Sequence, residues 1–469
     1  MPGSTLSRRQ FLKTSAVALS GAVLAACGAA ATPTPTPAPA KPTAPSAPAT
    51  GGAPTAVPAN TSVTGTFRFA FDNETETRNP ATDLFFKKFY PNMKPAYEVT
   101  PSGYEEKLLA SIASGDPPDL AYVHESRFAS FASQGAMMVL DDLLAKQPLI
   151  DGNDKYPLDI LKRNNQWQGK WMAFPYGAAF LFIAYNKTMF QQANVPLPKE
   201  GWTWQDFLTA AQTLTKDTTG KGTPDQWGWI GWNPGWMPAQ WPLKQSYGAF
   251  DFNDTLDTCI INNDAGVQIL DFMRTTWVGN TRCSPTPAQL TQLQSGTTKL
   301  FEGGKAAMKN ILSPNVISTL DAIAGSGKFE MGIEIYPAGP KGPFVRTGGS
   351  EVFIPKGSKH PQIAWELTRY LIGDEEANKL AATYKDGNPL LRLDYILKYN
   401  VPEGPLKADM VRIITTSFQK YGTVVQYSKL GTYGAIWSAN CDKMAAGELT
   451  AKQCADAIAA AANKELKGG

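Results

Sequence analysis

The sequence predicts an α/β fold, and three observations support this prediction. Short apolar segments with the alternation of strands are interspersed with amphipathic segments of helical length from about residue 63 onward. Glycine and proline signals separate most of these segments. The 469-residue chain is 43% hydrophobic and 18% charged, which is enough apolar material for large cores. Strand–helix alternation of this kind favours mainly parallel sheets, whose ligands bind beyond the carboxyl ends of the strands.

The first half of this body predicts four strands and two helices. Residues 66–71 (TFRFAF) alternate with period two, as a half-buried strand does. Residues 102–115 carry acidic side chains early and end at Gly115, which are the start and stop signals of a helix. The other elements expected here are a helix at 83–92 and strands at 96–101, 119–124 and 180–186.

The second half predicts four helices and two strands. The helix at 203–216 opens with Thr203 as its N-cap and Asp206 three residues later, a variant of the capping box with Asp in place of Glu. The remaining helices are expected at 263–277, 359–373 and 455–466, and the strands at 332–337 and 351–355.

The N-terminus has the features of an export signal. Residues 7–13 read SRRQFLK, which matches the twin-arginine consensus, and the apolar run that follows is too short to span a membrane. The run ends in LAAC, a lipobox-like sequence whose cysteine, Cys27, would be lipidated. We therefore expect a twin-arginine lipoprotein signal at 1–27 and a protein anchored to the outer face of the cytoplasmic membrane through Cys27. The alternative is an uncleaved anchor helix with an incidental cysteine.

Residues 28–62 are expected to form a disordered stalk, because nine of these 35 positions are proline. Residues 1–62 contain four basic side chains and no acidic one, so they account for the net charge of +3 and leave the body close to neutral. A near-neutral body argues against a nucleic-acid partner, whose phosphates require clustered Lys and Arg.

The body contains four cysteines, and an even number in an exported chain suggests disulfides. The sequence allows three pairings. Short loops favour Cys259–Cys283 and Cys441–Cys454, while four buried thiols are the alternative.

Catalytic and metal-binding motifs are missing from the sequence. HExxH, GxSxG and GxxxxGK[ST] do not occur, and His124 and His360 are the only histidines. We therefore expect no metal, no cofactor and no enzymatic activity. A surface-anchored glycosidase or lyase remains an alternative, because its two carboxylates need not be neighbours in sequence.

Tryptophan is concentrated in one segment. Five of the 12 tryptophans lie between residues 227 and 241, where glycine and proline interrupt them. An indole ring offers a flat apolar face and one N–H donor, which suits a sugar ring. The segment therefore favours one or two tryptophans lining a cleft, with core packing as the alternative for each.

Two segments of the body are the most distinctive. Residues 104–123 read YEEKLLASIASGDPPDLAYV, and residues 183–215 read IAYNKTMFQQANVPLPKEGWTWQDFLTAAQTLT. Together with 127–143, 301–308, 348–371 and 445–461, they resemble, in the same order, segments of the family 1 extracellular solute-binding proteins. These are the maltose-binding-like sugar receptors of ABC importers.

The resemblance implies a two-lobed, type II periplasmic-binding-protein-like fold with mixed, mostly parallel sheets and a three-segment hinge. Lobe one would comprise 63–175 and 334–394, and lobe two 176–333 and 395–469. A carbohydrate would bind between the lobes, which close on it. The protein, expected to be a monomer, would then deliver the sugar to the importer's permease subunits.

The resemblance also implies ligand-binding residues at matching positions. In lobe one, the first strand is followed by Asp72 and Asn73, while Glu125 and Arg127 match an acid–arginine pair in which Ser126 is a rival. The other candidates are Tyr176 at the hinge, Gly349 and Ser350 in the second segment of lobe one, and Trp232, Trp236, Asn310 and Tyr433 in lobe two. Trp437, one helical turn beyond Tyr433, is expected to be core.

Overall fold

The computed structural model describes residues 59–72, 79–150, 156, 158–235, 237–293, 296–326, 329–382, 392–422 and 432–468. The predicted signal, Cys27 and most of the predicted stalk lie outside these ranges. The end of the predicted stalk belongs to the folded body. The Asn60 N–H donates to the Phe89 carbonyl at 2.8 Å, and the Asn92 amide donates to the Thr61 carbonyl at 2.7 Å. The body therefore begins before residue 63.

Eight strands form one sheet in the order β2-β1-β3-β10-β6-β8-β7, with β9 also paired to β6, and β4 and β5 form a separate pair. The strands are β1 (Gly65–Phe71), β2 (Met93–Val99), β3 (Leu120–His124), β4 (Gln166–Trp167), β5 (Lys170–Trp171), β6 (Phe174–Asn186), β7 (Trp227–Trp229), β8 (Ala306–Leu312), β9 (Met331–Glu334) and β10 (Thr347–Phe353).

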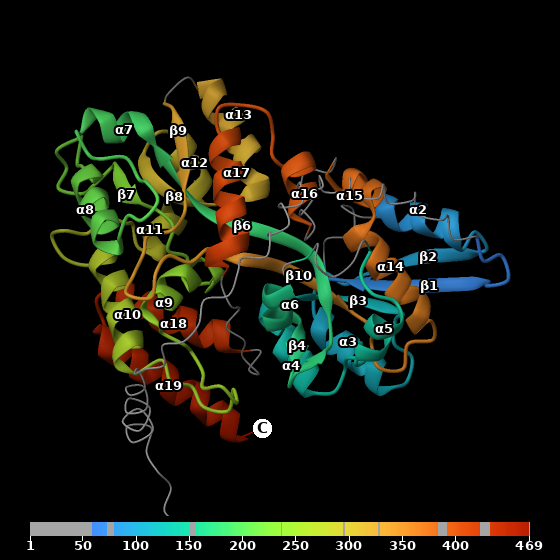
Figure 1. Ribbon diagram of the computed structural model, residues 1–469. Coiled ribbons are helices and arrows are strands. Elements are labelled where there is room, and N and C mark those ends of the chain that lie inside the picture. Colours follow the sequence, from blue (N-terminus) through green and yellow to red (C-terminus); the bar gives the residue numbers. More distant parts are fainter. Residues whose placement is uncertain are drawn as a thin grey trace, which may run out of the picture. The chain divides into compact units, whose positions relative to one another are not determined.

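The sheet is mixed rather than mostly parallel. Parallel pairing is found for β1 with β2 and β3, and for β7 with β8. β10 pairs antiparallel with β3 and β6, and β6 pairs antiparallel with β8 and β9. β6 and β10 run side by side in opposite directions (Figure 1). More strand pairs are antiparallel than predicted, because β6 and β10 each pair antiparallel with all of their neighbours.

Helices flank the sheet (Figure 1). Within the described ranges, no helix has the length and the apolar character that a membrane span requires. The α-helices are α2 (Asn79–Phe89), α3 (Tyr104–Ala113), α4 (Phe128–Ser133), α5 (Asp141–Lys146), α6 (Leu158–Asn165), α7 (Lys187–Gln192), α8 (Trp204–Leu214), α9 (Trp241–Tyr247), α10 (Asp264–Trp277), α11 (Pro287–Gln292), α12 (Gly296–Glu302), α13 (Val316–Ser326), α14 (Pro361–Gly373), α15 (Glu375–Ala382), α16 (Leu393–Tyr395), α17 (Lys407–Thr416), α18 (Tyr433–Ala445) and α19 (Ala451–Gly468). Shorter 3-10 or π turns are η1 (Glu125–Arg127), η3 (Met237–Ala239), η4 (Ser313–Asn315), η5 (Ile396–Asn400) and η6 (Ser417–Tyr421).

Local sequence signals set several helix ends. The Thr203 hydroxyl accepts from the Asp206 N–H and the Asp206 carboxylate accepts from the Thr203 N–H, so the predicted capping box starts α8. α3 ends just before Gly115, which has φ +80°, a conformation that glycine adopts without strain.

The buried apolar residues form four clusters that divide along the sequence. Two clusters draw on residues 67–176 and 352–377, and the other two draw on 180–345 and 396–462. β6 contributes to both groups, with Phe174 in the first and Ile183 in the second. Tyr336 and Val345, which follow the expected boundary at 334, still pack within the second group.

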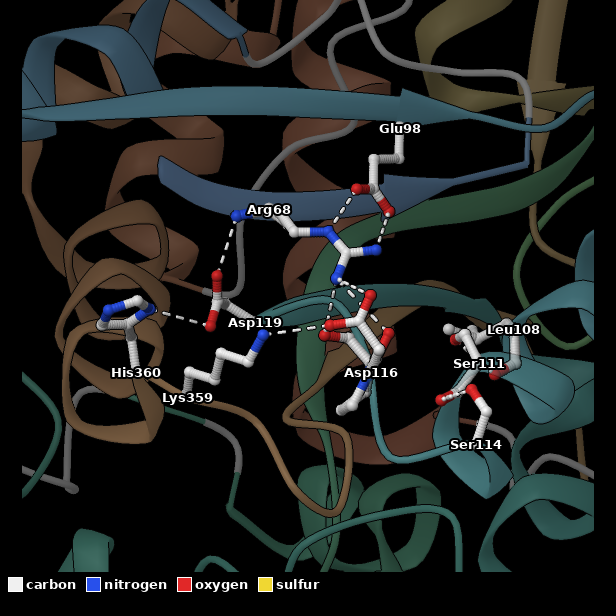
Figure 2. Close-up of polar contacts among 10 residues, drawn as sticks. Arg68, Glu98, Leu108, Ser111, Ser114, Asp116, Asp119, Lys359 and His360 are labelled. Atoms are coloured by element: carbon white, nitrogen blue, oxygen red, sulfur yellow. Dashed lines mark hydrogen bonds and ion pairs between the residues drawn. The ribbon is translucent and has the colours of Figure 1, made fainter. Parts of the chain in front are cut away.

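A polar network holds together the end of the sheet where β3 begins (Figure 2). The Arg68 guanidinium on β1 donates to both carboxylate oxygens of Glu98 on β2, and it also pairs with Asp116 at 3.2 Å. The buried Asp119 carboxylate accepts from the Arg68 N–H at 2.9 Å and lies 3.0 Å from His360 Nδ1. The network therefore fixes the loop after α3 to β1, β2 and the start of α14.

The four cysteines of the body are buried free thiols, so the predicted Cys259–Cys283 and Cys441–Cys454 bridges are not formed in this structure. All four lie in the largest apolar cluster. Burial raises the pKa of Cys259 to about 11 and that of Cys283 to about 12, which keeps both protonated. Burial and a hydrogen bond with Cys454 also raise the pKa of Cys441.

Candidate functional site

A cavity of about 270 Å³ lies at the carboxyl ends of β1 and β3. It combines acidic, basic and aromatic side chains, which is the mixture found in small-molecule sites. Its lining residues are Asp72, Gly103, Tyr104, Glu105, Glu106, Tyr122, Val123, His124, Arg127 and Phe131.

The parallel strands bring these side chains to one edge of the sheet. β1 and β3 are parallel neighbours, so Asp72 after β1 and His124 at the end of β3 both reach the same cavity. Tyr104 opens α3, and its hydroxyl donates to the carbonyls of Ala70 at 3.1 Å and Tyr122 at 2.7 Å. These bonds tie the first turn of α3 to both strands.

An ion pair and a neutral histidine define the polarity of the cavity. Arg127 Nε lies 2.9 Å from Glu105 Oε1. Burial raises the pKa of Glu105, and the Arg127 charge partly opposes this shift. Burial lowers the pKa of His124, so its ring is neutral at pH 7. His124 Nδ1 accepts from the Ser126 N–H at 3.3 Å and lies 2.8 Å from the Ser126 hydroxyl.

Comparison with known proteins assigns the chain to a family. A model of the bacterial extracellular solute-binding proteins matches residues 66–378, which is most of the body. The chain belongs to this family.

Individual relatives agree with that assignment. This solute-binding protein is 28% identical over 309 residues to an arabinooligosaccharide-binding protein of Bacillus subtilis, a match that covers 63% of this chain and 66% of that relative. It is 27% identical over 147 residues to a periplasmic protein of Agrobacterium fabrum named for binding sn-glycerol 3-phosphate, covering 30% of this chain and 34% of the relative. These matches span less than two thirds of each relative's length.

The fold is also found among solved structures. An ABC substrate-binding protein of Listeria monocytogenes, determined in complex with cycloalternan, superposes with a TM-score of 0.70 at 20% identity. The match covers 86% of this chain and all of that one. The predicted periplasmic-binding-protein-like fold is thereby confirmed. Membership of an extracellular family implies that the protein is exported.

The candidates predicted around η1 of this solute-binding protein have different environments. Asp72 and Arg127 both line the cavity. Ser126 is half-buried and bonded to His124. Glu125 is 0% exposed and accepts two hydrogen bonds from the Arg346 guanidinium. Glu125 is absent from the cavity lining because its buried carboxylate is bonded to Arg346, and its contact with a ligand stays a prediction.

Tyr176, Gly349 and Ser350 are buried supports. Tyr176 packs in the first group of apolar clusters against Phe69 and Phe71. The Ser350 hydroxyl is buried and lies 2.7 Å from the Tyr122 hydroxyl, while Gly349 pairs with Ala178 in the sheet. Sequence position suggested direct ligand contact for these residues, but in this structure they pack behind the cavity wall.

The described lobe-two candidates are also committed to the interior. Trp232 is 1% exposed and Tyr433 is 3% exposed, and both belong to the largest apolar cluster, which favours core packing over their predicted role as sugar platforms. The half-buried Asn310 donates to the Gly231 carbonyl and accepts from the Tyr336 hydroxyl. Trp437 is buried core, as predicted. Asn73 and Trp236 lie outside the described residues.

Sequence reasoning missed several residues of the cavity. The sequence indicated Tyr104 and Glu105 only as the start of a helix. A helix that begins beside the ends of two parallel strands faces the same edge of the sheet as those ends, so both residues could have been placed at the cavity. His124 could have been found as a rare histidine at a strand end. No group of three or more potential metal-ligating side chains occurs in the part of the chain that the structure describes.

Proposed function

We propose that the protein is the binding component of an ABC importer, which captures a carbohydrate between two closing lobes and passes it unchanged to a membrane permease. The cavity at the ends of β1 and β3 is the observation that carries this proposal. Its carboxylates and guanidinium suit hydroxyl groups, and Tyr104 and Phe131 add apolar surface.

The charges of the cavity favour a neutral ligand over a phosphate ester. Three carboxylates, those of Asp72, Glu105 and Glu106, line the cavity. The guanidinium of Arg127 is already paired with Glu105. A phosphate dianion would meet repulsion from the acids, whereas sugar hydroxyls can donate to them. The name of the Bacillus subtilis relative also favours an oligosaccharide.

The lobes and the membrane anchor complete the proposal. Lobe one would comprise 63–175 and a second segment that begins near 346, and lobe two would comprise the intervening segment and 395–469. The clusters of buried residues support this division. SRRQFLK and LAAC support twin-arginine export and lipidation at Cys27, which would hold a monomeric receptor at the outer face of the cytoplasmic membrane.

A surface glycosidase or lyase is the competing function, and one experiment separates the two. Purified protein is screened by thermal unfolding against arabinooligosaccharides, maltooligosaccharides and glycerol 3-phosphate, and each active ligand is recovered and analysed. A ligand at 100 times its Kd should stabilise the folded protein by about 2.7 kcal/mol. We expect an oligosaccharide to raise the melting temperature and to be recovered intact. Cleavage products would support the enzyme, and stabilisation by glycerol 3-phosphate alone would overturn the carbohydrate assignment.

A further inference from the structure

A buried ion pair lies directly behind the cavity. Arg346 Nε donates to Glu125 Oε1 at 2.9 Å, and a second guanidinium nitrogen donates to the same oxygen. Glu125 is 0% exposed and Arg346 is 3% exposed. Glu125 is the first residue of η1, and the last residue of the same turn is Arg127, which lines the cavity. The ion pair therefore anchors the turn that presents Arg127.

A second carboxyl group shares this buried environment. Glu351 on β10 is 2% exposed, and it pairs in the sheet with Val123, two residues before Glu125. Oε2 of Glu125 and Oε2 of Glu351 both lack a hydrogen-bond partner among the described residues. Two carboxyl groups thus compete for one buried cation, and a buried charge without a partner is costly.

The surroundings determine which carboxyl group stays neutral. Burial, together with repulsion from Glu125, raises the pKa of Glu351 well above its usual value of 4.5, and Arg346 only partly opposes this shift. The other charged or titratable groups near the cluster include His124, Asp72, Arg127 and Tyr336, and burial raises the pKa of Tyr336 well above its usual value. Burial lowers the pKa of His124, so its ring adds no charge at neutral pH. The centroid of the Trp241 ring of α9 lies 5.9 Å from the guanidinium carbon of Arg346.

We propose that Arg346 and Glu351 are positioning residues for the carbohydrate cavity: Arg346 holds Glu125, and Glu351 retains a proton so that the buried cluster is electrically neutral. The neutral cluster fixes η1 and thereby the direction of Arg127. The expected change in carbohydrate affinity rests on the proposed function. The proton on Glu351 and the anchoring of η1, by contrast, are properties of the ligand-free protein.

The raised pKa of Glu351 fixes the sign of its pH effect. The folded state binds this proton more tightly than the unfolded state, so the stability contributed by protonated Glu351 is fully present below about pH 4.5 and is lost as pH rises toward the folded pKa. Glutamine mimics the protonated carboxyl group and cannot ionise. Glu351→Gln should therefore gain stability relative to the wild type as pH rises.

The first test compares melting temperatures of wild type, Glu351→Gln and the exposed control Glu448→Gln from pH 4.5 to 8. We expect the difference between Glu351→Gln and wild type to grow with pH and to be zero or positive at pH 8, while the control follows the wild type. If Glu351→Gln instead becomes progressively less stable than wild type as pH rises, the Glu351 carboxyl group of the wild type is ionised and pairs with Arg346. That result would overturn the proposal. If the variant does not fold, infrared spectroscopy of the wild type at neutral pH decides: a protonated carboxyl band supports the proposal, and its absence overturns it.

The second test removes the two-nitrogen contact while retaining the charge. Arg346→Lys cannot donate from two nitrogens of a rigid plane. We expect faster amide hydrogen exchange at residues 124–128 in ligand-free Arg346→Lys, with unchanged exchange at β7, and weaker carbohydrate binding by about tenfold or more, which is about 1.4 kcal/mol. Unchanged exchange at 124–128 would overturn the positioning role. A wild type that binds no carbohydrate would instead overturn the proposed function and leave the exchange result standing.

Discussion

Burial determines which individual side chains can meet a ligand. Trp232 has the composition and sequence context of a sugar platform, but its ring packs against Trp229 at 5.2 Å and Trp204 at 6.1 Å between ring centroids. Asp72 and Arg127 follow strands at the sheet edge and line the cavity. Side chains at strand ends remain accessible because the sheet stops there.

Trp232→Ala tests the core assignment. Removing a buried indole should cost about 3–5 kcal/mol of unfolding free energy, because the cavity left behind is lined by other aromatic rings. Carbohydrate affinity per folded molecule should be unchanged. Denaturant unfolding measures the unfolding free energy, and titration of the folded protein measures the carbohydrate affinity. Leu197→Ala, which truncates an exposed side chain, is the control. A loss of affinity at unchanged stability would contradict the core assignment and restore Trp232 to the ligand site.

The sequence allowed the polar part of the cavity to be predicted better than its aromatic part. Asp72 and Arg127 could be placed because the family resemblance implies ligand-binding side chains directly after two of the predicted strands. The burial of Tyr433 and Trp232 could not be predicted, because aromatic composition does not distinguish a cleft wall from a core. The ion pair of Glu125 could not be predicted, because its partner, Arg346, is more than 200 residues away in sequence.

Close packing between elements adds constraints that no local pattern reveals. β7 lies against α8, and a Cβ added at Gly228 would sit 1.9 Å from the Ala211 carbonyl oxygen. That atom belongs to the backbone, so it cannot rotate away. Only glycine allows this approach of strand to helix.

Gly228→Ala should therefore destabilise the protein, by about 1–3 kcal/mol or more, as overpacking does. Gly325→Ala is the matched control. Gly325 lies in α13 with open space around its added Cβ, and alanine in a helix is favoured by about 0.5–1 kcal/mol over glycine. Thermal unfolding should show a lower melting temperature for the first variant and an equal or higher one for the second. Equal melting temperatures for wild type and Gly228→Ala would contradict the contact between β7 and α8.

Elements with strong local signals were predicted closely. The capping box starts α8 at the expected residue, and Gly115 follows the end of α3. The strand expected at 351–355 begins earlier, at Thr347, because pairing with β6 extends it through glycine-rich sequence that has little strand propensity.

For the whole molecule, the order of the six family-like segments predicted the family and the fold. The positions at which the chain crosses between the two groups of apolar clusters could be found only from the structure. Ile335, Tyr336 and Val345, which follow the expected boundary at 334, pack with the second group of clusters. β6 and β10 link the two groups through one sheet. The Glu125–Arg346 ion pair lies beside these strands, so the link and the cavity share one buried polar cluster.

The claim that a carbohydrate binds at the cavity containing Arg127 can be checked by calorimetric titration. The oligosaccharide that raises the melting temperature is titrated into wild type, Arg127→Ala and the lobe-two control Arg282→Ala. Loss of a hydrogen bond to a charged group is expected to cost about 1.5–3 kcal/mol, so Arg127→Ala should weaken binding by tenfold or more, since 1.4 kcal/mol is a factor of ten. Arg282→Ala should bind as the wild type does. Equal dissociation constants for all three proteins would place the ligand elsewhere and contradict the claim.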